Sequence, residues 1–155
     1  MIDEAAVQAL IDRAAISDVV HAYATAVDRR DWDQFRSLFT DPVFIDFRWF
    51  HPSLHRALSL DELVANTRGI AAFDATQHIS SNHVHRLAGD RATCVSYMHA
   101  GHFLKRDGVE HACFLYGYYT YELLRTAGGW KVDRYGLQVT AQFGEPRLFE
   151  WVGMR

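Results

Sequence analysis

The sequence predicts an α+β fold in which helices cover one face of a curled antiparallel sheet. Two observations carry this prediction: the segments before about position 72 are mainly helical in pattern, and from Ala75 onward apolar side chains alternate with a period of two. The length of 155 residues, with 49% hydrophobic and 23% charged side chains, suits a globular domain. No linker or repeat interrupts the chain, so we expect one domain over residues 1–155.

Three helices are expected in the first part of the chain. Residues 3–27 form the longest, because apolar side chains recur at intervals of three and four and acidic residues occupy the first turn. A short helix starts at Asp31 in the segment DWDQFRSLF and ends before Pro42. Ser59 and Glu62 form a capping box, which predicts the start of a third helix, SLDELVANTRGI.

Five strands are expected. The first covers residues 43–50, VFIDFRWF, which are rich in residues that favour strands, and a loop, HPSLHRA, follows it. Tight turns containing AGD, DG and TAGG separate four longer strands, and such turns join antiparallel neighbours. The sequence therefore predicts a meander made of residues 75–87, 91–106, 109–125 and 130–143.

Asp28 is the first candidate for chemistry. It lies at one margin of the buried stripe of the first helix, where a half-buried carboxylate must find a partner or shift its pKa. One interpretation is structural: Asp28 caps the next helix or pairs with Arg29 or Arg30. The other is that the sheet supplies its partner.

The histidines of the strands are placed by alternation, because every second side chain shares one face of a sheet. This rule puts His78 on one face of its strand and His83 and His85 on the other. On the next two strands, shared faces carry Met98 with His102, and His111 with Tyr119. A lone histidine in a strand is usually a hydrogen-bonded structural residue. His78, His102 and Asp28 could nevertheless converge if the sheet curls over the first helix.

The pair His83 and His85 also raises the question of a metal ion. We expect none, because two histidines on one strand face are too few ligands and no local motif supplies a carboxylate as the third. Both side chains are expected to be exposed or edge-lying on the outer face of the sheet. The sequence has no glycine-rich phosphate loop or dinucleotide fingerprint, so no cofactor is expected either.

Charge and composition limit the partners. A formal net charge of -3 argues against nucleic acid or an anionic membrane surface. The N-terminal segment is acidic where a signal peptide would be basic, and no apolar run could span a bilayer. Cys94 and Cys113 lie in apolar strand segments and are expected to be reduced thiols, which favours a cytoplasmic protein. Aromatic residues make up 14% of the chain, enough to line a cavity for a small hydrophobic ligand.

Four features, in this order, carry a resemblance to a known family: AVDRRDWDQFRSLF, FIDFRWF, the triplet Thr76-Gln77-His78, and His102 ahead of a basic turn. They resemble scytalone dehydratases, and the chain is identified as a SnoaL-like member of the nuclear transport factor two-like superfamily over about residues 11–145. The resemblance implies a cone-shaped α+β barrel whose curved sheet wraps around the long N-terminal helix and two shorter helices.

The resemblance also implies the site. Asp28 and His78 match the family's catalytic dyad and His102 matches its second histidine, while Tyr23 resembles the catalytic tyrosine of bile acid dehydratases. The two tyrosines that hold a water in scytalone dehydratases are replaced here by Val27 and Phe47, so other groups must hold the substrate. The tail, with its two aromatic rings, is expected to close or border the pocket. The further residues expected to bind substrate are Tyr119, His111, Met98, Phe149 and Trp151.

The activity implied is that of a cofactor-independent lyase, most simply a dehydratase acting on a hydrophobic cyclic or polyketide-like carbonyl compound. His78, held by Asp28, would remove a proton from carbon, and His78 or His102 would protonate the departing hydroxyl. A cyclase or isomerase, or a non-catalytic ligand-binding or assembly domain, remain alternatives on this fold. A homo-oligomer is expected, preferably a trimer and otherwise a dimer, because the outer sheet face carries Ile79, Phe114, Tyr116 and Tyr118.

Overall fold

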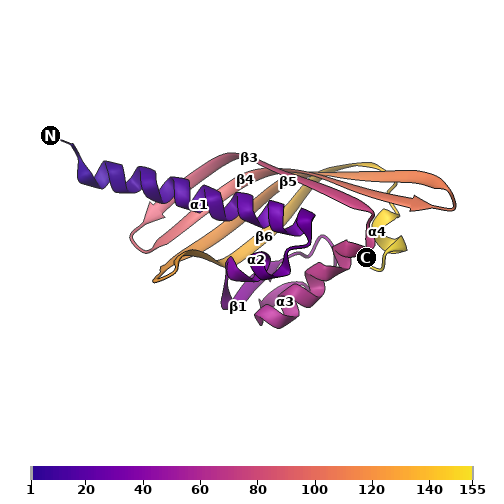
Figure 1. Cartoon of the computed structure of the whole chain (residues 1–155), viewed down its shortest axis with the longest axis horizontal. Helices are drawn as coiled ribbons and strands as arrows, with labels where there is room; N and C mark the ends of the chain where they lie inside the picture. Colours follow the sequence, from indigo (N-terminus) through magenta and orange to yellow (C-terminus); the bar gives the residue numbers. More distant parts are fainter. Residues whose placement is uncertain (1, 155) are drawn as a thin grey trace.

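The structure, a computed structural model, describes residues 2–154. One curved six-stranded sheet has the order β2-β1-β6-β5-β4-β3, and helix α1 lies across its inner face (Figure 1). All neighbouring strands pair antiparallel except β1 and β6, which pair parallel. The elements are α1 (Glu4–Arg29), α2 (Trp32–Ser37), β1 (Phe39–Asp46), β2 (His55–Leu58), α3 (Leu60–Thr67), the 3-10 helix η1 (Arg68–Ala72), β3 (Ala75–Ala88), β4 (Arg91–Arg106), β5 (Val109–Thr126), β6 (Gly129–Gly144) and α4 (Leu148–Trp151).

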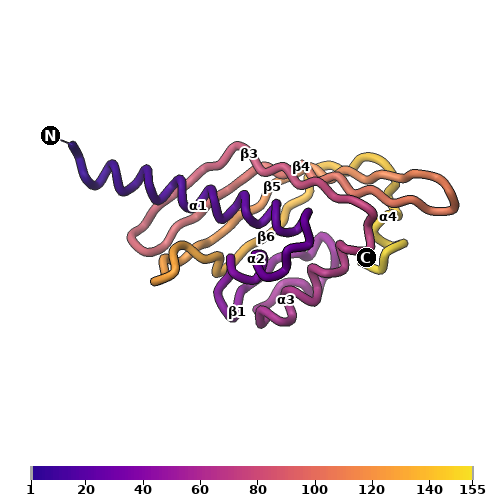
Figure 2. The backbone as a smooth tube through the Cα atoms, viewed as in Figure 1, coloured from indigo at the N-terminus to yellow at the C-terminus, as the bar shows by residue number. Residues whose placement is uncertain are grey.

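Helix α1 forms as expected and runs two residues past the predicted end. Asp3 caps its start by accepting hydrogen bonds from the backbone N–H groups of Ala5 and Ala6. Its apolar stripe packs into the core: Ile16, Val20, Tyr23 and Val27. The first turns of α1 extend beyond the edge of the sheet, as the backbone trace shows (Figure 2).

The expected α+β fold is confirmed, with helices on one face of a curved sheet, and so is the meander of β3 to β6. The capping box of Ser59 and Glu62 is present at the start of α3. Three predictions around β1 were wrong. The strand begins at Phe39 rather than at Val43. Residues 47–50 form a turn rather than the end of a strand, closed by the N–H of Phe50 donating to the carbonyl of Phe47. The segment predicted as a loop contains β2, a short strand whose backbone groups pair with β1.

A β-bulge in β3 corrects the prediction for two histidines. The register with β4 shifts between Ser81 and Val84, and Asn82 has a left-handed backbone with φ of 52°. The extra residue reverses the alternation, because two residues of β3 there oppose one of β4. His83 and His85 therefore point to the same inner face as His78 and are partly buried, not exposed on the outer face.

No helix within residues 2–154 combines the length and apolar character needed to cross a bilayer. Cys94 and Cys113 are both buried thiols, as expected.

Candidate active site

A cavity of about 280 Å³ opens between α1, α3 and the inner face of the sheet. Its wall is mostly apolar and includes residues from every strand of the meander. Seven of the expected site residues line the cavity. Four are expected substrate-binding residues, Val27, Phe47, Met98 and Tyr119, and three are expected catalytic residues, Tyr23, His78 and His102. Other lining residues, which the sequence reasoning did not single out, include Ile45, Leu63, Ile70, Leu115, Tyr135, Leu137 and Met154.

Asp28 and His78 form a close pair, of which His78 lines this cavity and Asp28 does not. The Nδ1 atom of His78 lies 2.6 Å from Oδ1 of Asp28, and the backbone N–H of His78 donates to Oδ2 at 2.7 Å. The hydroxyl of Thr76 donates to Oδ1 at 2.9 Å. The carboxylate thus accepts three hydrogen bonds from one strand, which fixes both its position at the end of α1 and the orientation of the imidazole ring.

Asp28 neither caps the following helix nor pairs through its carboxylate with Arg30. Asp31, not Asp28, caps α2, by accepting from the N–H of Gln34. Arg30 donates to the backbone carbonyl of Asp28 at 2.6 Å and to that of Phe73 at 3.1 Å, rather than to the carboxylate. Arg30 therefore links the end of α1 to the start of β3. The carboxylate of Asp28 forms its ion pair with His78 instead.

The charge state of the pair follows from these contacts. Burial raises the pKa of Asp28, but the hydrogen bond and charge of His78 outweigh it and hold that pKa below its ordinary value of 3.8. At neutral pH Asp28 is an anion, so it selects the His78 tautomer with the proton on Nδ1. The other ring nitrogen, Nε2, then carries a lone pair. A neutral imidazole with a carboxylate behind it is a suitable general base.

His102 is close to His78 but differs from it in charge. The two rings lie 5.5 Å apart, nearly perpendicular, and His102 is only 2% exposed. Burial, and after it the charge of His78, lowers the pKa of His102 to about 3. His102 is therefore neutral at pH 7 and cannot supply a proton as an imidazolium, although its N–H can still donate a hydrogen bond.

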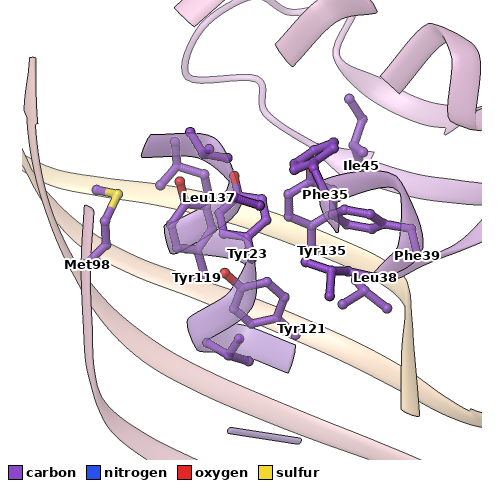
Figure 3. Packing of buried hydrophobic residues seen from close by; sticks show 14 of the residues in the cluster. Tyr23, Phe35, Leu38, Phe39, Ile45, Met98, Tyr119, Tyr121, Tyr135 and Leu137 are labelled. Carbon is purple, nitrogen blue, oxygen red and sulfur yellow. The ribbon is translucent and has the colours of Figure 1, made fainter. Parts of the chain in front are cut away.

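Three tyrosines face the same cavity. The ring of Tyr23 lies 5.5 Å from that of Tyr119 and 5.7 Å from that of Tyr135 (Figure 3). Burial raises the pKa of Tyr119 to about 12 and raises that of Tyr23 and Tyr135 as well. All three hydroxyls stay protonated at neutral pH, so they form a group of hydrogen-bond donors at the wall of the cavity.

The sequence did not indicate Tyr135. Strand β6 has an irregularity in its pairing with β5: Leu123 pairs with Val132, but the next residue back, Glu122, pairs with Arg134. The strict alternation of inner and outer side chains is therefore interrupted between Val132 and Tyr135. A pattern of two predicts Arg134 on the inner face, whereas the structure buries Tyr135 there and exposes Arg134. An irregular strand of this kind gives no clear signal in the sequence.

Three residues expected to bind substrate lie outside the cavity lining. Phe149 is fully buried behind His102, with their rings 4.7 Å apart. His111 and Trp151 pack on each other at 5.0 Å, and the guanidinium of Arg106 lies 4.7 Å from the Trp151 ring. The tail reaches the cavity through three other residues, Val152, Gly153 and Met154. They follow α4, which buries its apolar side and turns the chain back.

The family model described as a SnoaL-like domain matches residues 8–136. The structure is similar to that of the Kfla4162 protein from Kribbella flavida, with 32% identity and a TM-score of 0.80 over 87% of this chain and 95% of that chain. It is also similar to "Putative Scytalone Dehydratase" from Novosphingobium aromaticivorans, with 22% identity and a TM-score of 0.77 over 88% and 89% of the two chains. A third similar structure is hexachlorocyclohexane dehydrochlorinase LinA-type3 from Novosphingobium barchaimii, with 16% identity and a TM-score of 0.72 over 90% and 94%. A search of curated proteins found no match.

Proposed function

The chain belongs to the SnoaL-like domain family, and we propose that it is a cofactor-independent lyase that removes water from a hydrophobic cyclic or polyketide-like carbonyl compound. The observation that carries this proposal is that His78, which lines an open apolar cavity, is hydrogen-bonded to the carboxylate of Asp28. A non-catalytic assembly domain has no need of such a cavity. The names of the similar dehydratase and dehydrochlorinase structures suggest eliminations, and those proteins share only the fold with this chain.

The proposed mechanism uses proton transfers alone. Nε2 of His78 takes a proton from the carbon next to the substrate carbonyl, and the resulting imidazolium is stabilised by the Asp28 anion 2.6 Å away. The electron pair of the broken C–H bond moves toward the carbonyl oxygen, where tyrosine hydroxyls donate hydrogen bonds to the developing negative charge. The pair then forms the new carbon–carbon double bond as the hydroxyl leaves. The same imidazolium returns its proton to that hydroxyl, so hydrogen and hydroxide depart as water.

His102 has a different role in this proposal. Because it is neutral at pH 7, we assign it to positioning rather than to proton donation. Its ring lies between His78 and Phe149 and restricts how the His78 ring can tilt.

The shape of the cavity favours a compact, ring-containing substrate. A cavity of about 280 Å³ with a mainly apolar wall suits a small cyclic compound. Binding an unpaired charged group against this wall would be costly. The test is a screen of cyclic and aromatic hydroxy-ketones, with the products identified by mass spectrometry and NMR. Loss of water supports the proposal, whereas a product of unchanged mass would indicate an isomerase or cyclase. If some compounds bind tightly and none reacts, the proposal of an enzyme is contradicted and a ligand-binding domain is favoured instead.

Tyr135 offers a test of the tyrosine group. Replacing Tyr135 with phenylalanine should lower kcat/KM by a factor on the order of ten to a hundred, because one donor to the developing charge is removed. Tyr121→Phe is a matched control: Tyr121 packs on the same rings, but its hydroxyl has no hydrogen-bond partner among the described residues and does not line the cavity. Steady-state kinetics of the two variants should therefore differ, and equal losses would remove Tyr135 from the site.

The tail gives a second test. Removal of residues from Val152 onward should raise KM several-fold with a smaller change in kcat, because Val152, Gly153 and Met154 form part of the cavity wall. The Met154 side chain also packs near Gly69 of η1, where the tail borders the cavity. Truncation after Glu145 is less informative, since it would also delete the core residues Leu148 and Phe149 and so disturb the fold. Unchanged kinetics in the shorter truncation would exclude a role of the tail in binding.

We further propose that the protein is a homo-oligomer, with a trimer preferred, that packs through the outer face of the sheet. Large apolar side chains on this face are exposed: Ile79 at 47%, Val84 at 58%, Tyr97 at 58% and Tyr116 at 38%. Light scattering at micromolar concentration should give a multiple of 17.8 kDa, and Tyr97→Glu should reduce it. A monomeric mass for the unaltered protein would contradict this proposal.

The partner in the proposed function is thus a small molecule, and we place the protein in the cytoplasm. Two buried cysteine thiols suit a reducing compartment. Cell fractionation checks the location.

A further inference from the structure

Arg30 occupies a backbone position that favours glycine. It follows the last residue of α1 and has a left-handed conformation, with φ of 56° and ψ of 32°. Helices commonly end in this way with a glycine, because a β-carbon is crowded in the left-handed region. An arginine there is a strained residue, and such an outlier points to a role of its side chain.

The side chain of Arg30 folds back over the end of α1 and joins it to β3. Its Nη1 atom donates to the backbone carbonyl of Asp28 at 2.6 Å, and Nη2 donates to that of Phe73 at 3.1 Å. A third and longer contact of 3.4 Å runs from Nη1 to the hydroxyl oxygen of Thr76. The carboxylate of Asp28 forms its ion pair with His78. Arg30 therefore acts on this site by fixing the backbone rather than by pairing with the carboxylate.

These contacts set the direction of a hydrogen-bond chain that ends at His78. A guanidinium can only donate, so the Thr76 oxygen accepts from Arg30 and its single hydrogen is left for another group. That hydrogen points to Oδ1 of Asp28, 2.9 Å away. The same Oδ1 lies 2.6 Å from Nδ1 of His78. The carboxylate oxygen that receives the imidazole proton is thus held from its other side by Thr76.

Arg30 and Thr76 lie behind the dyad, away from the substrate. Both side chains are partly buried, and neither residue lines the cavity. Any effect that they have on the reaction must therefore pass through Asp28 and His78.

We propose that Arg30 and Thr76 are positioning residues of the dyad. Arg30 holds the last turn of α1 against β3 through two backbone carbonyls, and Thr76 fixes the rotation of the carboxylate at the end of that turn. Together they keep Oδ1 of Asp28 in line with Nδ1 of His78, and a small misplacement of a catalytic group lowers a rate strongly. This inference rests on the proposed function, because that proposal makes His78 the base.

Kinetics of Thr76 variants give the first test. Thr76→Val removes the hydroxyl and keeps the shape of the side chain, so kcat should fall by about 10-fold to 100-fold while KM changes little. Thr76→Ser keeps the hydroxyl and should restore most of the rate. Thr140→Val is the control and should retain full activity, because the Thr140 hydroxyl donates to a backbone carbonyl, that of Tyr116, outside the cavity lining. Full kcat in Thr76→Val would contradict the role of Thr76.

Proton NMR tests the geometry without a substrate, so its result does not depend on the dehydratase proposal. The proton between Nδ1 of His78 and the carboxylate lies in a short, charge-assisted contact and should give a downfield resonance that is lost in His78→Ala. In Thr76→Val and Arg30→Lys this resonance should move upfield or exchange faster with water. Lysine keeps the positive charge but lacks the planar fork that spans the two carbonyls. Arg29→Lys, at the neighbouring exposed position, is the control and should leave the resonance unchanged.

One more variant keeps the result decisive. If Arg30→Lys does not fold, Arg30→Gly suits the left-handed backbone, lacks the guanidinium and should change the resonance in the same direction. A changed resonance in a protein that dehydrates no compound would support the positioning role and count against the proposed function alone. A lower Tm with an unchanged resonance and an unchanged kcat would make Arg30 and Thr76 structural residues only and overturn the inference.

Discussion

Replacing His78 with alanine should lower kcat/KM for the dehydration by a factor on the order of 10² to 10⁴, because the group that takes the proton from carbon is lost. Ligand binding should persist, since most of the cavity wall is apolar and remains in place. Binding measured by calorimetry and turnover measured on the same compound separate the two effects.

The matched control for this variant is His51→Ala. His51 is exposed and bonds locally to Ser53, away from the cavity lining. It should retain full activity. If His78→Ala retains it too, His78 is not the base.

Asp28→Asn should lower the rate by a factor of about a hundred or more. Asp28 accepts three hydrogen bonds, from the hydroxyl of Thr76 and from two N–H groups of His78. An amide has one acceptor oxygen, and its NH₂ group would face a donor, so at least one N–H of His78 loses its partner. In either orientation of the amide, the imidazole loses the anion that stabilises its protonated form.

Folding must be checked for this variant, because an unsatisfied buried donor costs about 1 to 3 kcal/mol. Asp18→Asn, an exposed position on α1, is the control for the change of charge and should behave as the unaltered protein. Circular dichroism and denaturant unfolding show whether a loss of rate comes from the site or from the fold. Normal turnover by folded Asp28→Asn would contradict the role of the carboxylate.

The stability of the pair has a defined pH dependence. The pKa of Asp28 is held below 3.8 in the folded state because His78 outweighs the effect of burial. A lowered folded pKa stabilises the protein above the unfolded value and loses that stabilisation as pH falls through the folded value. The stability difference between the unaltered protein and Asp28→Asn should therefore shrink in acid below about pH 4.

Local patterns in the sequence could place Asp28 and His78 separately, and the resemblance paired them; the structure brings the two side chains into contact. Asp28 lies one helical turn from Ala24 on the margin of a buried stripe, and His78 alternates with Thr76 on a strand whose first half is regular. The resemblance named the same residues. Only the curvature of the sheet, which brings β3 over the end of α1, had to be supplied by the fold.

What the sequence could not predict depends on irregular or long-range backbone structure. A bulge at Asn82 moved His83 and His85 to the inner face, and an irregular pairing of β6 turned Tyr135 into the cavity. Parallel pairing of β1 with β6 joins segments about ninety residues apart, and it has no local sequence pattern. The tail does border the cavity, but through Val152, Gly153 and Met154. Phe149 is buried in the core instead, and Trp151 packs on His111.

Hydrogen exchange at carbon tests the central claim most directly, because it reports proton removal before any water is lost. The protein is incubated in D₂O with a cyclic ketone that fills the cavity but carries no leaving hydroxyl, and NMR follows deuterium at the carbon next to the carbonyl. The unaltered protein should speed incorporation well above the rate without protein, and His78→Ala should return it to that rate. Equal exchange with the unaltered protein and with His78→Ala, for a ketone that both bind, would contradict the assignment of His78 as the base.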